Sequence, residues 1–154
     1  MRQLLLIAAA SVAFASGVMA EEEDPFADAV EMRHGLMLQM ATDLGKVGAM
    51  AKEEAPYDAA VAGKAAANIA AIASVLSMDQ FPAGSEYQKS ADSFALPAVW
   101  EKQDDFLQKV ADLNTAAAAF QTAAGTDLAS LKAGMEGIGG ACAACHKAYR
   151  QPEE

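Results

Sequence analysis

Residues 127–151 read DLASLKAGMEGIGGACAACHKAYRQ, and apolar side chains recur in this stretch at intervals of three and four residues. Such spacing predicts an amphipathic helix whose apolar face packs against the rest of the protein. Thr126 can cap the start of this helix, and the negative charge of Asp127 suits the positive end of the helix dipole. The side chains that we expect to face the core are Leu128, Leu131, Met135, Ile138, Cys142, Cys145 and Tyr149.

Three earlier segments show the same helical spacing. Pro56 ends the first of them, Asp58 can cap the second, and Pro97 suits the first turn of the third. Between the second and third helices, residues 79–97 lack the pattern and form a long loop. The expected fold is therefore all-α, an antiparallel up-down four-helix bundle with a long loop between helices 2 and 3. The three earlier helices are predicted at residues 26–52, 59–78 and 97–124.

Composition limits the class of protein. The chain has 154 residues, 53% apolar and 21% charged, with a formal net charge of −10. This apolar content can bury a core, which excludes a disordered acidic chain. The negative charge argues against a nucleic-acid partner, because phosphates are bound by clustered Lys and Arg. Two cysteines are too few for a disulfide-stapled scaffold.

The first segment resembles an export signal. Arg2 provides a basic start, residues 4–14 are apolar, and residues 16–20 (SGVMA) end in small side chains. This pattern predicts a secretory signal peptide at residues 1–20, cleaved after Ala20, and a mature domain at residues 21–154. A membrane anchor would need about 20 apolar residues, more than this segment has. We therefore expect a periplasmic protein without membrane insertion.

The sequence Cys142-Ala143-Ala144-Cys145-His146 is a C-x-x-C-H motif, the attachment pattern of a c-type haem. Cysteines three residues apart share one helix face, so their sulfurs can add to the two vinyl groups of one macrocycle. The adjacent His146 can place a neutral imidazole nitrogen on the iron. The motif predicts one covalently attached haem c, with His146 as a metal ligand.

A disulfide, a thioredoxin-like redox pair and a zinc site are the three alternative roles for the two cysteines. A disulfide between cysteines three apart in a regular helix would strain the bond geometry. A thioredoxin-like redox pair normally lies in a βαβ context, of which the sequence shows no sign. A zinc site would need ligands beyond Cys142, Cys145 and His146, and the only other histidine is His34.

Four segments together resemble the cytochrome c′ family, the class II c-type cytochromes. The resemblance spans the mature chain and implies a haem that lies along the bundle, held by the last helix and faced by the first. It also implies an electron carrier or a gas-binding protein. The segments are residues 31–37 (EMRHGLM), 55–58 (APYD), 97–100 (PAVW) and 142–150 (CAACHKAYR).

The family has two branches, which differ in the residue opposite the axial histidine. An apolar residue there leaves a five-coordinate, high-spin iron that binds nitric oxide or carbon monoxide. A methionine there ligates the iron, and the protein is a low-spin electron carrier. When Arg33 is aligned with the family arginine, this position falls on Met37. The resemblance thus favours a one-electron carrier with His146 and Met37 as metal ligands, and the gas-binding protein is the alternative.

The antiparallel arrangement is compatible with this assignment. In an up-down bundle the start of the first helix lies beside the end of the fourth, which brings Met37 and His146 to similar levels. Met37 can instead be a core residue, because methionine often fills gaps in cores. His34 is a second candidate ligand. No group of nucleophile, base and orienting residue is visible, so we do not expect an enzyme.

Two arginines complete the expected haem site. The resemblance implies that Arg33 faces a haem propionate and that Arg150 lies beside the axial imidazole. The alternatives are a surface ion pair for Arg33 and a charge at the helix C-terminus for Arg150. The acidic surface predicts redox partner proteins with a basic docking patch. Small residues in the second helix would permit a homodimer as well as a monomer.

Overall fold

The computed structural model describes residues 23–152. Within this range the chain is helical, and its only β-type pairing is one isolated bridge between Ala95 and Arg150. The expected signal peptide, residues 1–20, lies outside the described residues and stays a prediction. In the described part of the chain, no helix has both the length and the apolar character that a membrane crossing requires.

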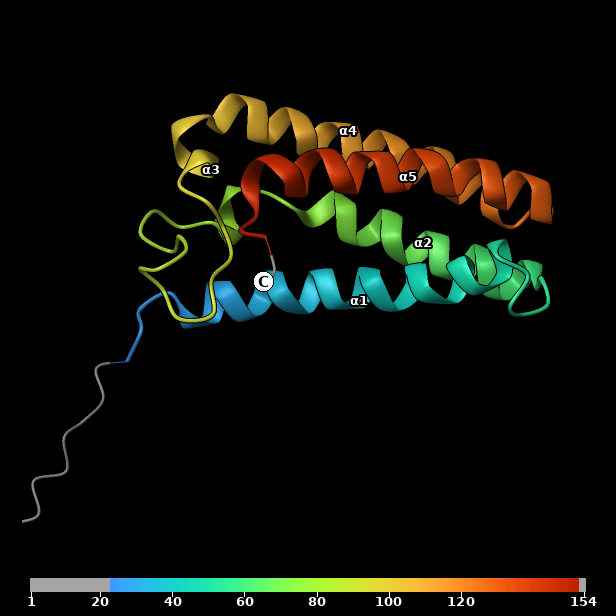
Figure 1. Ribbon diagram of the computed structural model, residues 1–154, viewed down its shortest axis with the longest axis horizontal. Helices are drawn as coiled ribbons and strands as arrows, with labels where there is room; N and C mark the ends of the chain where they lie inside the picture. Colours follow the sequence, from blue (N-terminus) through green and yellow to red (C-terminus); the bar gives the residue numbers. More distant parts are fainter. Residues whose placement is uncertain (1–22, 153–154) are drawn as a thin grey trace, which may run out of the picture.

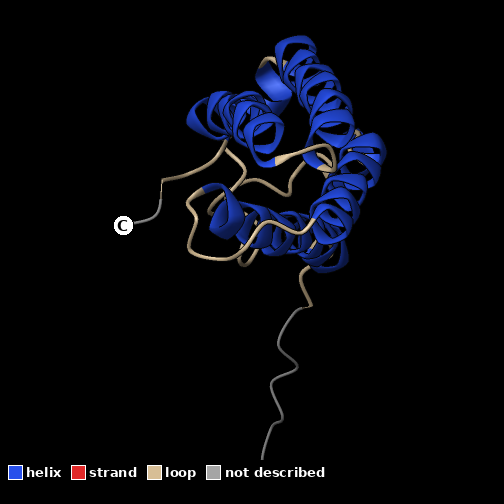
Figure 2. Cartoon of the chain, turned by 90° about the vertical axis from the view of Figure 1, so that its right-hand side faces the viewer, coloured by secondary structure: helices blue, strands red, loops and turns tan. Residues whose placement is uncertain are grey.

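Four long helices form the predicted up-down bundle (Figure 1). Each runs antiparallel to the next, and their sides pack α1 on α2, α2 on α4, and α4 on α5. The contact between α1 and α5 is much sparser than that between α4 and α5. Viewed along its long axis, the molecule shows the helices side by side, joined by loops (Figure 2). The long helices are α1 (Ala27–Ala51), α2 (Ala59–Val75), α4 (Gln103–Ala124) and α5 (Leu128–Tyr149).

The helix starts follow local hydrogen-bond chemistry. Asp58 caps α2 as predicted, because its carboxylate accepts hydrogen bonds from the backbone N–H groups of Ala60 and Val61. The prediction that Thr126 caps the last helix is wrong. Asp127 has the extended backbone of a capping residue and accepts from the Ser130 N–H at 2.7 Å. The Thr126 hydroxyl instead donates to the carbonyl of Thr122 in α4.

The segment between α2 and α4 differs from the prediction. The second helix ends at Val75 rather than near residue 78, because Ser77 starts a separate 3-10 turn, η1 (Met78–Gln80), with its own capping box. The third predicted helix is broken at Lys102, whose backbone is not helical, into the short α3 (Ala98–Glu101) and α4. The break lets Trp100 donate to the Phe81 carbonyl at 2.9 Å.

The core has two parts. The larger part lies between the four long helices and includes Ile69, Phe120 and Leu131, all 0% exposed. The smaller part lies where α3, the start of α4 and the end of α5 meet, and it contains Phe106 and Tyr149. The C-x-x-C-H motif lies between them, since Cys142 packs on the larger part and Cys145 on the smaller.

Candidate functional site

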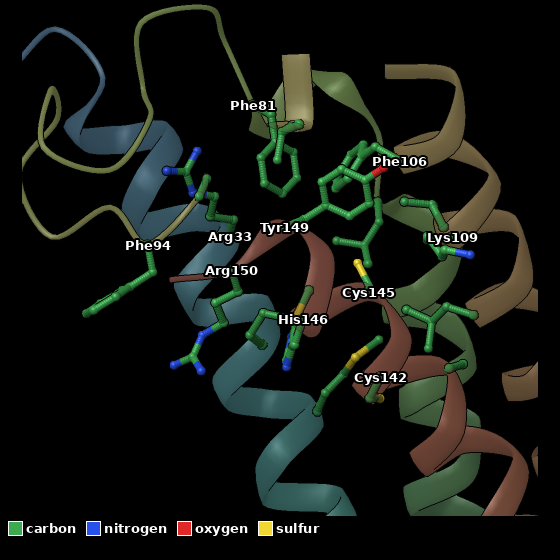
Figure 3. Close-up of a pocket in the computed structure, with 18 of the residues that line it drawn as sticks. Arg33, Phe81, Phe94, Phe106, Lys109, Cys142, Cys145, His146, Tyr149 and Arg150 are labelled. Atoms are coloured by element: carbon green, nitrogen blue, oxygen red, sulfur yellow. The ribbon is translucent and has the colours of Figure 1, made fainter. Parts of the chain in front are cut away.

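A cavity of about 570 Å³ opens beside the C-terminal half of α5. Its volume lies within the range of pockets that hold a small-molecule cofactor. Cys142, Cys145 and His146 all line it from α5, with His146 toward α1 and Cys145 toward Lys109 and Phe106 of α4 (Figure 3). From the opposite side α1 contributes Met37 and His34. The structure therefore brings both predicted metal ligands and both predicted attachment residues to one cavity.

Cys142 and Cys145 are not joined in a disulfide, and each is partly buried. Burial raises the pKa of Cys142, and burial together with the neighbouring Cys142 raises the pKa of Cys145 to about 11. Both side chains are therefore uncharged thiols at neutral pH before a thioether link is formed. Among residues 23–152 no three His, Cys, Asp or Glu side chains gather into a metal site, which disfavours the zinc reading.

His146 is in the protonation state that iron ligation needs. Burial lowers its pKa, and the positive charge of Arg150 lowers it further. Its imidazole is thus neutral near pH 7 and has a nitrogen lone pair to offer a metal. The carbonyl of His146 accepts from the Arg150 N–H at 3.0 Å, which fixes the last turn of α5 around the motif.

Met37 and His34 occupy different parts of the cavity wall. Met37 is partly buried and packs against the larger core, while its side chain also lines the cavity. The ring of His34 packs near Phe94, with 6.0 Å between the ring centroids. Burial and the charge of Arg33 lower the pKa of His34, so it too is neutral near pH 7. Both candidate ligands named from the sequence are therefore available at the site.

Arg33 is only 4% exposed and lines the cavity. Its Nη1 donates to the Gln80 carbonyl at 3.1 Å and to the Ser85 hydroxyl at 2.9 Å. Its Nη2 donates to the Ser85 carbonyl at 2.8 Å and to the Ser93 hydroxyl at 2.6 Å. The guanidinium also lies 5.1 Å from the centroid of the Phe81 ring. Sequence reasoning missed these loop partners, which are distant from Arg33 along the chain.

Arg150 and Tyr149 close the end of the site. The guanidinium of Arg150 lies 5.5 Å from the centroid of the Phe94 ring. The Tyr149 hydroxyl donates to the Asp105 carboxylate at 2.5 Å, and the Tyr149 ring meets Phe106 edge-on at 5.3 Å between centroids. Burial and the hydrogen bond to Asp105 raise the pKa of Tyr149 to about 12. The helical spacing placed Tyr149 on the core-facing side but did not indicate its partner.

The ionisable side chains around the cavity fit an anionic cofactor. No Asp or Glu among residues 23–152 lines the cavity, although acidic residues outnumber basic ones by 21 to 11 in the chain. Charged guanidinium and ammonium groups are the natural partners of carboxylates such as haem propionates. The remaining wall is largely apolar, as a macrocycle requires. The cationic lining residues are Arg33, Lys109 and Arg150.

Comparison with known proteins agrees with this geometry. A family model described as Cytochrome C′ matches residues 28–150. Cytochrome c-554 of Cereibacter sphaeroides is 59% identical over 124 residues, which cover 80% of this chain and 93% of that protein. The solved cytochrome c′ from Rhodobacter spheriodes has a TM-score of 0.79 and 31% identity, covering 83% of this chain and 98% of its own.

A second solved structure bears on ligand chemistry. It is the nitric oxide complex of a leucine-to-alanine mutant of cytochrome c prime from Alcaligenes xylosoxidans. Its TM-score is 0.74 and its identity 29%, with 86% of this chain and 100% of that one covered. The fold is therefore shared with a mutant protein that was solved as a nitric oxide complex.

Proposed function

The chain belongs to the cytochrome c′ family and carries one covalently attached haem c, and from this premise we propose that it is a low-spin electron carrier whose iron is held by His146 and Met37. The observation that carries the proposal is that these two side chains line one cavity from helices on opposite sides. Cys142 and Cys145, on the same face of α5 as His146, would form the two thioether links.

The protein is an electron carrier and not an enzyme. The bound haem supplies the one-electron chemistry by cycling between iron(III) and iron(II). The cysteines hold the macrocycle to α5, and His146 offers a neutral nitrogen. Apolar side chains such as Val99 and Phe106 keep water from the cavity wall. Two fixed ligands would leave little to rearrange when the electron moves, and a thioether ligand would raise the reduction potential.

Arg33 and Arg150 are proposed as cofactor-binding residues. Both line the cavity, and each brings a positive charge that suits a carboxylate. The four terminal N–H groups of Arg33 already donate within the protein, so its Nε–H is the group left for a cofactor. The four hydrogen bonds that Arg33 makes through Nη1 and Nη2 are consistent with a fixed cation in the cavity wall. For Arg150, packing on Phe94 holds the charge at the cavity wall.

The alternative function is a five-coordinate, high-spin protein that binds or senses nitric oxide or carbon monoxide. The observation that favours it is the similarity to a cytochrome c prime mutant solved with nitric oxide. Absorption spectra of the purified holoprotein in both oxidation states, followed by carbon monoxide titration of the reduced form, distinguish the two. A low-spin spectrum and resistance to carbon monoxide support the carrier. A high-spin spectrum with ready binding supports the gas-binding protein and rejects Met37 as a ligand.

The cellular setting is part of the same proposal. The signal peptide predicted at residues 1–20 would direct the chain to the periplasm, where its partners would be redox proteins with a basic docking patch. We propose a monomer or a homodimer. Mass spectrometry of protein purified from the periplasm would show a mature N-terminus at Glu21 if cleavage follows Ala20, and retention of Met1 would reject the signal peptide.

A further inference from the structure

The long segment between α2 and α3, which includes η1, crosses the end of the bundle that contains the cavity (Figure 1). We call residues 77–96 the strap. It contributes Phe81 and Phe94 to the cavity wall, and three of its serines are buried although their side chains are polar. These buried serines, Ser85, Ser90 and Ser93, take part in hydrogen bonds that fix the strap to the rest of the molecule.

The strap is bound to the start of α1 at three points. The Asp24 carboxylate accepts from the Ser90 hydroxyl at 2.6 Å and from the Ala91 N–H at 2.8 Å. The Phe26 ring fills the space beside Gly84, where a Cβ atom would lie 2.7 Å from the ring. The third point is the Arg33 guanidinium with its four hydrogen bonds. Of the three, only Arg33 lies within the helix, one turn before Met37.

The other end of the strap is bound to the end of α5. The Leu96 N–H donates to the Tyr149 carbonyl at 2.9 Å, and the Gln151 N–H donates to the Phe94 carbonyl at 2.8 Å. These residues follow His146 by about one helical turn. The strap thus joins the turn that precedes Met37 to the turn that follows His146.

Few direct contacts join α1 to α5. The faces of α1 and α5 approach each other sparsely, while α5 packs closely on α4. The cavity separates α1 from α5 at the level of the candidate ligands. The strap therefore spans the gap across which a ligand from α1 would have to reach a metal held by α5.

We propose that Arg33 is a positioning residue, which fixes the strap to α1 and so keeps Met37 at the distance from α5 that six-coordination requires. This inference rests on the proposed His146 and Met37 ligation. The planar guanidinium is suited to the task because its two terminal nitrogens bind acceptors at different points of the strap. A lysine would keep the positive charge, but its single nitrogen could not replace the two terminal nitrogens of the guanidinium.

Two variants of the holoprotein test the role of the strap. Arg33→Lys keeps the positive charge and removes the planar group with two terminal nitrogens. The double variant Ser85→Ala with Ser93→Ala removes two acceptors of Arg33 that do not line the cavity, so any effect on the iron must pass through the strap. We expect both to show a high-spin fraction that the wild type lacks. We also expect carbon monoxide association with the reduced form to be about tenfold faster, in proportion to the population of open sites.

A matched control separates positioning from general destabilisation. Asp127→Ala removes the N-cap of α5 at the opposite end of the helix. It should lower the melting temperature while leaving the spin state and the carbon monoxide rate of the wild type unchanged. If both strap variants also keep wild-type spectra and rates, the positioning role of Arg33 is rejected while Met37 ligation stands. If the wild type is itself high-spin, Met37 ligation is rejected, and the inference with it.

Discussion

The sulfur of Met37 is the atom on which the proposed coordination depends. It lies on α1 and lines the cavity opposite the motif that holds His146. Replacing it by leucine keeps the volume and apolar character of the side chain but removes the only atom that can bind iron. The change therefore affects ligation far more than packing.

We expect the Met37→Leu holoprotein to be high-spin when oxidised and to bind carbon monoxide readily when reduced. Its reduction potential should fall, because thioether ligation raises the potential of a haem. Met32→Leu is the control, since Met32 is on the same helix but is 54% exposed and outside the cavity. Absorption and electron paramagnetic resonance spectra measure the result. A Met37→Leu protein that stays low-spin would reject the assignment and direct attention to His34.

Asp43 is a buried carboxylate that the sequence pattern did not reveal. It is 1% exposed, and its side chain accepts hydrogen bonds from Lys46, Gln39 and Asn68. Burial opposes ionisation, but the three hydrogen bonds outweigh it and hold the pKa of the carboxyl below its ordinary value of 3.8. The charged form is therefore the one that joins α1 to α2.

The lowered pKa gives the stability contribution of Asp43 a defined pH dependence. Because the folded-state pKa is below the unfolded one, the contribution is complete above about pH 4 and is lost as the pH falls through the folded value. We expect Asp43→Asn to destabilise the protein by about 1–3 kcal/mol at pH 7, since donors are left without an acceptor. Urea unfolding measures this difference, which should shrink in acid. If the difference in unfolding free energy between wild type and Asp43→Asn does not change with pH, Asp43 is not ionised in the folded protein.

Among the helices, the closest packing lies between α4 and α5. A Cβ atom at Gly134 would lie 2.8 Å from the Phe120 ring, and Phe120 is 0% exposed and cannot move freely. Gly137, one turn further along α5, has nothing within 4 Å of the same position. Close packing against Phe120 therefore requires a glycine at position 134 but not at position 137, although both glycines lower the helix propensity of α5.

We expect Gly134→Ala to destabilise the protein by about 1–3 kcal/mol through overpacking against Phe120. Gly137→Ala is the matched control, and it should be neutral or stabilising by up to about 1 kcal/mol, because alanine favours helix more than glycine does. Thermal unfolding of both holoproteins measures the contrast. Equal effects at the two positions would show that helix propensity, and not the contact with Phe120, governs the site.

Elements with local signals could be predicted from the sequence, and those that depend on distant partners could not. The helical spacing, the Asp58 cap and the C-x-x-C-H motif are all readable within a few residues. The partners of Arg33 are 47 to 60 positions away along the chain, and no spacing rule connects them. The break at Lys102 is likewise not marked by a helix-breaking residue, and beside it Trp100 of α3 donates to the distant Phe81 carbonyl in the strap.

At the scale of the whole molecule, the net charge of −10 should govern how charged reactants approach. We expect electron transfer to a small cationic oxidant, such as a ruthenium hexaammine complex, to slow as ionic strength rises from about 0.01 M to about 0.15 M. Oxidation by the anion ferricyanide should accelerate over the same range. Stopped-flow measurements of both rates test this. If both trends are reversed, the cationic side chains of the cavity, rather than the overall charge, control approach.

The described chain begins at Glu23 and stops at Pro152, and both ends lie at the cavity end of the bundle (Figure 1). A group attached at Glu23 or Pro152 would therefore lie on the side of the strap and the cavity. The turn at residues 52–58, which joins α1 to α2, lies at the opposite end. Attaching the protein to an electrode through a cysteine introduced there would leave the redox face directed outward, toward solution.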